Sequence, residues 1–296
     1  MIILFGSHNP SGAFFKHLSG DLALETWGRK NCGEEMNEQT FCNLADPLTW
    51  KPRPLNGVVV SFAPIWLLAD FLSFIALNNP VLLSGLQGVI ACSSSSYLTK
   101  KYSFNIMDQK LAATLEKAHA QLYSFCKFLS IPCQILAPTM IYGSIERYMD
   151  KNLGTLIRIM RRTPLIVLPE TVGLRQPVHA SQLACVALVK AQMILFGDWS
   201  EHEPFILTLG GDEILSYREM LTKLQGALRR DDAARKCRIL SIPDRLFYAL
   251  AAPLLPLNPK TFEAITRIKS NLSGFEKAHV ILQEKPKLFP VLPLPQ

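Results

Sequence analysis

The chain opens with a strand, a turn and a helix in direct succession, and this unit restricts the fold more than any other feature. A short apolar run, Ile2–Phe5, leads into a turn with glycines at positions 6 and 12 and then into the apolar-periodic stretch Ala13–Leu18. Short continuous apolar runs are typical of parallel strands that are buried on both faces. The unit therefore indicates an α/β protein with a parallel sheet.

Strand-like and helical stretches alternate along the first half of the chain. Further strands are predicted over Leu22–Thr26, Phe41–Leu44, Gly57–Phe62, Gly88–Cys92 and Pro132–Leu136. Periodic apolar spacing predicts helices over Ile65–Leu77 and Met107–Leu129. This alternation indicates right-handed crossovers and a doubly wound parallel sheet of the Rossmann type.

The chain changes character after residue 143. The later part contains many prolines and two short strand candidates, Leu165–Leu168 and Phe205–Leu209. We expect residues 1–143 to form the Rossmann domain. Residues 144–296 should form a smaller C-terminal α/β lid at the strand ends, interleaved with the Rossmann sheet.

Composition excludes several classes of protein. A chain of 296 residues with 49% hydrophobic and 19% charged residues can bury a full core. The net charge of +7 comes from scattered basic residues, so nucleic-acid binding is not predicted. Seven cysteines without a C-x-x-C pair predict reduced thiols, as in the cytoplasm, and no metal site.

No targeting or membrane-spanning segment is predicted. The N-terminus lacks the basic region and cleavage site of a signal peptide. The most apolar windows, Ile65–Leu77 and Leu246–Leu257, are shorter than the ~20 residues that cross a bilayer. We expect a cytoplasmic protein, with contact between the second window and a membrane surface left open.

The glycine turn predicts a dinucleotide site. Parallel sheets bind ligands at the carboxyl ends of their strands, and the first helix holds a pyrophosphate through its N-terminal amides. Gly6 and Gly12 suit the outer positions of a G-x-x-G-x-x-G loop, whereas Asn9 stands at the middle position. Asparagine tolerates a left-handed backbone better than most residues, so the turn can survive with this side chain near the pyrophosphate.

The residues around the end of the second strand bear on the choice of cofactor. An acid there accepts hydrogen bonds from a ribose, whereas a basic residue neutralises a 2′-phosphate. Glu25 lies at the predicted strand end, and Arg29 and Lys30 follow it. NADP is slightly favoured over NAD.

Several segments together resemble a known family. They are the Gly6 to Gly12 turn, the serine cluster Ser93–Ser96, the stretch Leu136–Gly143, the stretch Gly173–His179 and the stretch Leu209–Glu219. The chain resembles an atypical extended short-chain dehydrogenase/reductase, and more narrowly the NAD-dependent epimerase/dehydratase group that acts on nucleotide-diphosphate sugars. The resemblance runs from Ile2 to about Leu282. It implies a nicotinamide cofactor in the first domain and a nucleotide sugar held by the second.

The resemblance also implies roles for single residues. Asn43 would contact the adenine, and Ala63 and Pro138 would complete the cofactor site at later strand ends. Arg175 would bind the diphosphate of the sugar nucleotide. Ser94, or Ser95 next to it, would orient the substrate hydroxyl.

The catalytic tyrosine and lysine of the family are where this chain departs. The family places Tyr-x-x-x-Lys early in the helix before Pro132–Leu136, where this chain has Ala113 and Lys117. Tyr123 and Lys127 have the spacing but lie at the wrong end of that helix. Tyr97, with Lys100 or Lys101, follows the serine cluster, and we select Tyr97 and Lys101 as the candidate base and its partner.

Two functions of different classes remain open. The first is an NAD(P)-dependent epimerase, dehydratase or reductase on a nucleotide sugar. The second is a non-catalytic NAD(P)-binding sensor or assembly protein that has lost the catalytic tyrosine. Either can be a homodimer, since the sequence does not decide the oligomeric state.

Overall fold

The chain divides into two compact units in a computed structural model that describes residues 1–29, 39–103, 105–253, 265 and 267–292. The first unit comprises Met1–Pro138, Ile145–Tyr148 and Ala180–Leu209, and the second comprises Thr139–Ser144, Met149–His179 and Gly210–Gln296. The sequence predicts a boundary after residue 143, with the later part interleaved. The chain passes between the units several times, since residues 145–148 and residues 180–209 both belong to the first unit. The binding roles of the two parts stay predictions.

The first unit is built on a parallel sheet. Its strands are β1 (Ile2–Phe5), β2 (Leu24–Gly28), β3 (Gln39–Phe41), β4 (Gly57–Ser61), β5 (Leu86–Cys92), β6 (Cys133–Pro138) and β11 (Ile206–Gly210). They pair in the order β11-β6-β5-β4-β1-β2-β3, and each of these pairings is parallel. This order confirms the predicted α/β fold with a doubly wound, Rossmann-type sheet.

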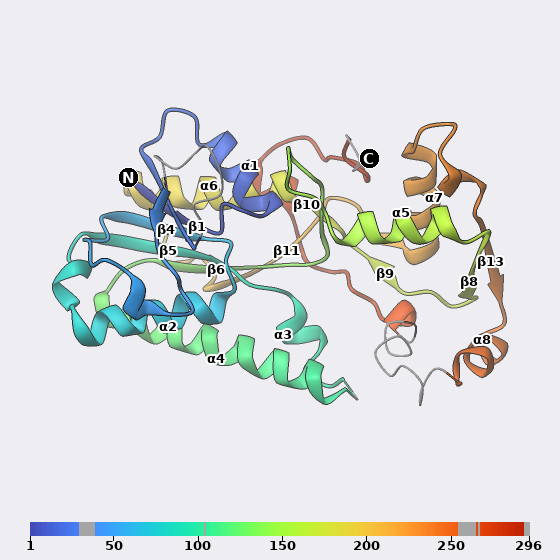
Figure 1. The fold of residues 1–296 in the computed structure, drawn as a ribbon, viewed down its shortest axis with the longest axis horizontal. Coiled ribbons are helices and arrows are strands. Elements are labelled where there is room, and N and C mark those ends of the chain that lie inside the picture. Colours follow the sequence, from blue (N-terminus) through green and yellow to red (C-terminus); the bar gives the residue numbers. More distant parts are fainter. Residues whose placement is uncertain (30–38, 104, 254–264, 266, 293–296) are drawn as a thin grey trace. The chain divides into compact units, whose positions relative to one another are not determined.

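Helices cover both faces of this sheet. Helices α1 (Pro10–Leu18) and α6 (Ala180–Phe196) lie on one side, and α2 (Ile65–Asn78) and α4 (Ile106–Leu129) lie on the other (Figure 1). Strand order reverses between β1 and β4, because the chain goes from β1 outward to β3 and then returns to β4. In open parallel sheets, ligands bind outside the carboxyl ends of the strands at such a switch point.

The remaining elements of the first unit are short. They are η1 (Pro47–Thr49), η2 (Pro80–Leu83) and α3 (Ser96–Thr99). The predicted helices agree with α2 and α4 to within one residue at each end. Strand β2 instead begins two residues later than predicted, because pairing with β1 places Ile2 opposite Leu24. Strand β3 begins two residues before its predicted start, because it pairs with β2 from Gln39 opposite Thr26.

Aromatic rings fill the core beneath the strand ends. Trp27 of β2 is 1% exposed and packs edge-on against Phe5 of β1, with ring centroids 5.5 Å apart. Trp50 lies 5.8 Å from Trp27 and 5.2 Å from Phe71 of α2. These four rings support the loops that follow β1 and β2, since close-packed aromatic groups leave their neighbours little room to move.

The second unit consists of short paired strands and helices. The strand pairs are β7 (Ile141–Tyr142) with β10 (Val178–His179), β8 (Leu165–Pro169) with β13 (Arg238–Ile242), and β9 (Leu174–Arg175) with β12 (Leu215–Ser216). Its other elements are α5 (Asn152–Arg162), α7 (Tyr217–Ala227), η3 (Ala233–Lys236), α8 (Asp244–Ala251), η4 (Arg267–Lys269), β14 (Glu276–Lys277) and α11 (Ala278–Leu282). Within the ranges that the structure describes, no helix has the length and apolar character needed to span a bilayer.

Candidate functional site

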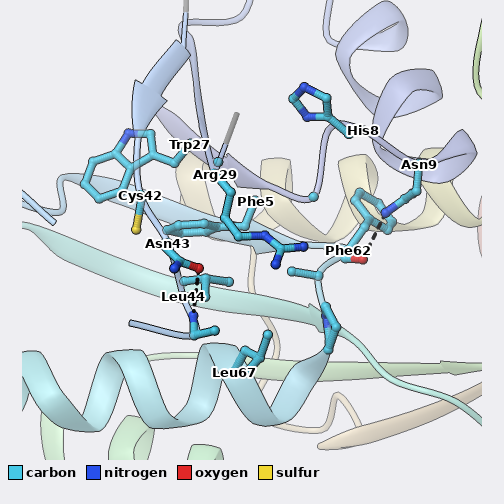
Figure 2. A pocket seen from close by; sticks show the side chains of 15 residues that line it. Phe5, His8, Asn9, Trp27, Arg29, Cys42, Asn43, Leu44, Phe62 and Leu67 are labelled. Carbon is cyan, nitrogen blue, oxygen red and sulfur yellow. Dashed lines mark hydrogen bonds between the residues drawn. The ribbon is translucent and has the colours of Figure 1, made fainter. Parts of the chain in front are cut away.

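A cavity of about 540 Å³ lies at the carboxyl ends of β1, β2 and β4, at the switch point of the sheet. Its size falls in the range of roughly 300–1,000 Å³ that is typical of small-molecule sites. The residues that line it are Phe5, Gly6, His8, Asn9, Trp27, Gly28, Arg29, Cys42, Asn43, Leu44, Ala45, Phe62, Ala63, Pro64 and Leu67 (Figure 2). The cavity therefore joins five predicted cofactor residues, namely Gly6, Asn9, Arg29, Asn43 and Ala63.

The two glycines of the turn allow close approach of backbone to backbone. Gly6 has a φ of +78°, and a Cβ atom there would lie 2.6 Å from the Ala63 nitrogen after β4. A Cβ atom on Gly12 would lie 2.1 Å from the Gly6 carbonyl oxygen. Side chains at these positions would separate the turn from both β4 and α1. Gly12 itself is not among the residues that line the cavity.

Asn9 caps the first helix with its side chain. Its Oδ1 atom accepts a hydrogen bond from the Gly12 N–H at 3.0 Å, and its Nδ2 donates to the Phe62 carbonyl oxygen at 3.0 Å. The φ of Asn9 is −131°, so the left-handed backbone suggested by an asparagine is wrong. The helix begins at Pro10, three residues before its predicted start, because this cap and a proline at the first position favour helix initiation.

Arg29 brings positive charge to the cavity. It follows the end of β2, and its side chain extends into the cavity (Figure 2). None of the described lining residues carries a carboxylate. Lys30, the second predicted phosphate contact, lies outside the described residues.

Glu25 does not take part in the cavity. Strand β2 continues to Gly28, so Glu25 lies within the strand rather than at its end. Its carboxylate accepts hydrogen bonds from Arg53 Nη1 at 2.9 Å and from Thr40 Oγ1 at 2.8 Å. This acid is therefore held away from the position where a ribose would be bound.

The wall after β3 combines one polar side chain with buried groups. Asn43 Oδ1 accepts a hydrogen bond from the Ala45 N–H at 3.2 Å, which fixes the turn after Cys42. Cys42 is 1% exposed, and burial raises the pKa of its thiol to about 12, so it stays protonated. Pro138 lies away from the cavity lining, and its carbonyl accepts a hydrogen bond from the Ser95 N–H at 2.9 Å.

Comparison with known proteins identifies the fold. Neither a protein-family model nor a curated protein matches this sequence. The structure is similar to UDP-glucose 4-epimerase from Bifidobacterium longum in complex with NAD+ and UDP, with a TM-score of 0.60, 12% identity, and coverage of 97% of this chain and 93% of that chain. This chain therefore has the same fold as that epimerase.

Two further solved structures extend this likeness. UDP-glucuronic acid 4-epimerase from Bacillus cereus in complex with NAD has a TM-score of 0.59 at 14% identity, with coverage of 97% of this chain and 92% of that chain. GDP-mannoheptose C4 reductase from Campylobacter jejuni with NADP bound has a TM-score of 0.55 at 12% identity, with coverage of 82% and 87%. The likeness concerns the fold.

The serine cluster forms the turn between β5 and α3. Ser94 Oγ donates to Ser96 Oγ at 2.9 Å and accepts a hydrogen bond from the Ser96 N–H at 3.2 Å. Ser93 Oγ lies 2.7 Å from Nε2 of His119, which is 4% exposed on α4. Sequence reasoning missed His119, and the signal was present as a histidine on the buried face of the helix that follows the serines.

Tyr97 and Lys101 are not joined in the structure. The Tyr97 ring packs edge-on against His119, with centroids 4.9 Å apart, and burial together with the Glu116 carboxylate raises the pKa of its phenol. Lys101 Nζ lies 2.7 Å from Glu116 Oε1, and Lys100 Nζ lies 2.7 Å from Asp108 Oδ1. Both lysines thus pair with carboxylates. The catalytic assignment of Ser94, Tyr97 and Lys101 stays a prediction.

The other Tyr-x-x-x-Lys positions lie on the outside of α4. Tyr123 is 48% exposed and packs edge-on against Phe205, and Lys127 lies 5.8 Å above its ring. Ala113 and Lys117 are exposed on the same helix. These four positions provide no buried proton acceptor for a substrate.

Arg175 is packed inside the second unit. It is 6% exposed, its Nη1 donates to the carbonyl oxygens of Leu174 and Ser270, and its Nη2 donates to the Arg267 carbonyl at 2.6 Å. The guanidinium carbon lies 5.2 Å from the centre of the Tyr217 ring. These contacts give Arg175 a structural role, whereas diphosphate binding by this residue stays a prediction.

Gln176, which follows Arg175, and Asp212 also stabilise the second unit. Gln176 is 1% exposed, and its side chain bonds to the Gly211 carbonyl at 2.8 Å and to both backbone groups of Phe275. Asp212 accepts hydrogen bonds from the N–H groups of His279 and Lys287, each at 2.8 Å. The motifs that carry much of the resemblance therefore connect segments that are distant in sequence.

Proposed function

We propose that this protein binds a nicotinamide dinucleotide, with NADP(H) preferred to NAD(H), and uses it to transform a nucleotide-diphosphate sugar. The observation that carries the proposal is the cavity at the switch point of a Rossmann-type sheet, into which Arg29 extends. Solved structures of the same fold that contain NAD or NADP support a nicotinamide cofactor.

The lining residues fit the adenosine half of such a cofactor. Arg29 would contact a 2′-phosphate, since a guanidinium donates two parallel hydrogen bonds to phosphate oxygens. Leu44 and Leu67 offer apolar walls to a flat base, and the Asn43 amide offers polar atoms to its edge. The absence of a carboxylate among the described lining residues favours NADP(H), because an acid there would repel the 2′-phosphate.

The chemistry depends on a base that acts on a substrate hydroxyl. A bound nicotinamide would accept or donate a hydride, and a side chain of this protein would have to move the proton. Tyr97 and Ser94 are the residues that we propose for this step. A phenol has a reference pKa of about 10, so it needs a neighbouring positive charge to act near neutral pH.

A non-catalytic NADP(H)-binding protein is the second candidate, and a specific observation favours it. The pKa of Tyr97 is raised, whereas a catalytic phenol requires a lowered pKa. Lys101, the proposed source of the lowering charge, is paired with Glu116. A protein with this arrangement would report or respond to the cofactor without converting a sugar.

Cofactor binding is tested by titration with NADPH and NADH. Trp27 lines the cavity, so tryptophan fluorescence should be quenched on binding. The variant Ala45→Trp places a bulky ring at an exposed position on the cavity wall and should abolish binding. Leu48→Trp is the matched control, because Leu48 is 82% exposed and does not line the cavity. Absence of binding at millimolar NADPH would contradict the proposal.

Turnover is tested on a panel of uridine, guanosine and thymidine diphosphate sugars. If Tyr97 is the base, Tyr97→Phe should lower the rate about 10²–10⁴-fold while NADPH affinity is unchanged. Ser94→Ala should lower the rate in the same assay. Cofactor binding without turnover of any sugar would support the non-catalytic candidate instead.

A further inference from the structure

The start of α1 has little capacity left for an anion. Pro10, its first residue, has no N–H, and the Gly12 N–H is bonded to Asn9 Oδ1 at 3.0 Å. The Ala13 N–H is bonded to the Asn9 carbonyl at 2.9 Å. The remaining residue of the first turn, Ser11, is 4% exposed. The donors with which a helix start usually binds a phosphate are thus occupied, missing or buried.

Asn9 is also held firmly in place. Its Nδ2 donates to the Phe62 carbonyl at 3.0 Å, so one amide group connects the start of α1 with the end of β4. A pyrophosphate that bound the Gly12 N–H would have to displace Asn9 Oδ1 and disturb this second bond as well. The net gain from binding a phosphate at that place is therefore small, since one hydrogen bond replaces another.

We propose that Asn9 takes the place of the cofactor's pyrophosphate at α1, so that the cavity holds NADP(H) mainly by its adenosine 2′-phosphate half. This inference rests on the proposed function and adds which part of the ligand supplies the affinity. Arg29 and the walls after β3 and β4 bind that half. The pyrophosphate and the nicotinamide ribose contribute little, and a mononucleotide with a 2′-phosphate is nearly as good a ligand as the dinucleotide.

The first experiment compares two ligands by isothermal titration of the wild-type chain. Adenosine 2′-monophosphate carries the phosphate that faces Arg29 and has no pyrophosphate, whereas NADPH carries both. The inference predicts dissociation constants within about tenfold of each other. An NADPH affinity more than about a hundredfold higher would overturn it, because the pyrophosphate would then contribute a strong charged contact.

The second experiment changes Asn9 and uses a matched control. Asn9→Gly frees the Gly12 N–H, and glycine at a helix cap costs only a few tenths of a kcal/mol relative to asparagine. Asn9→Ser removes the bond to Phe62 but keeps a hydroxyl that can accept from the third helical N–H. Ser216 of α7 makes that same bond to the Glu219 N–H, at 3.1 Å.

The two variants should differ for NADPH and agree for the mononucleotide. Asn9→Gly should bind NADPH about tenfold more tightly than wild type, which is the worth of one hydrogen bond to a charged oxygen. Asn9→Ser should retain the wild-type ratio of the dissociation constants of the two ligands. Thermal melting verifies that each variant folds. If Asn9→Gly does not fold, the comparison of the two ligands on the wild-type chain still tests the inference.

Three other results of these titrations would each contradict one specific claim. Equal NADPH affinity in the two variants would overturn the role of Asn9. Binding of NADPH without binding of adenosine 2′-monophosphate would overturn the inference and leave the proposed cofactor in place. Failure of both ligands to bind wild type would contradict the proposed function itself, and the inference with it.

Discussion

Gly12 lies against the backbone of Gly6, so closely that a Cβ atom on Gly12 would be 2.1 Å from the Gly6 carbonyl oxygen. Backbone cannot move aside as a flexible side chain can. Gly12→Ala should therefore destabilise the chain by about 3 kcal/mol or more, measured by urea unfolding. Gly154→Ala is the control, because nothing lies within 4 Å of a Cβ atom there and α5 should gain about 0.5–1 kcal/mol. Equal stability of the two variants would show that the contact at the turn is relaxed.

Arg29→Ala should remove the preference for NADPH. We expect a loss of about 10–100-fold in NADPH affinity with NADH affinity unchanged, because only NADPH carries the 2′-phosphate. In wild type the preference should shrink as salt rises, since charge contacts are screened over about 8–10 Å near physiological ionic strength. Arg53→Ala is the control, because Arg53 pairs with Glu25 and does not line the cavity. Equal affinities of the unchanged protein for both cofactors would contradict the assignment.

Arg175→Ala should lower stability rather than cofactor affinity. Removal of the guanidinium leaves the carbonyl oxygens of Leu174, Arg267 and Ser270 without these donors. A buried acceptor left unsatisfied costs about 1–3 kcal/mol, so we expect a loss of about 3 kcal/mol in urea unfolding. Arg175→Lys should restore only part of it, because an ammonium group cannot reproduce the fork. Unchanged stability with weakened nucleotide-sugar binding would instead favour the diphosphate role.

Stability should fall below neutral pH because of His179. Its ring is 4% exposed and lies against Gly143, and burial lowers its pKa from 6.5 to about 4. The unfolded chain therefore takes up the proton first, so the contribution is fully present above pH 6.5 and is lost as pH falls towards 4. Between pH 7.5 and 5 this histidine should account for about 2 kcal/mol of lost stability.

Urea unfolding of His179→Asn at both pH values measures this contribution. The variant should lose less stability than wild type on acidification. His202→Gln, at an exposed position, should behave as wild type. An identical pH dependence in all three proteins would assign the acid sensitivity to other groups.

Much of the site could be predicted from the sequence because its residues are local to strand ends. Gly6 and Arg29 follow β1 and β2 directly, and Ala63 stands two residues after β4. Parallel strands bring their carboxyl ends to one edge of a sheet. Predicting the ends of these strands to within two residues was therefore enough to predict that the three residues lie at one edge of the sheet. The conformation of Asn9 was not predictable in this way, because its side chain also donates a hydrogen bond to the carbonyl of Phe62, which follows β4.

The hydrogen-bond partners of charged and polar side chains could not be predicted from the sequence. Arg175 bonds to carbonyl groups that are more than ninety residues away, and Glu25 is bonded to Arg53, which is 28 residues away. Ser93 and His119 meet because the short helix α3, which follows the serines, packs against α4. A charged or polar side chain takes whichever partner the fold brings within reach, and its own neighbours in sequence do not reveal that partner.

The sequence by itself determined the alternation of strands and helices, the glycine turn after β1 and the set of residues at the strand ends, since apolar periodicity and backbone freedom are properties of short segments. Tertiary structure alone decided which donors and acceptors stay available for a ligand. It tied Asn9 to Phe62, Lys101 to Glu116, and Arg175 to the carbonyls of Arg267 and Ser270. Hydrogen bonds form between groups that packing brings within about 3 Å, and that distance is set by the whole fold.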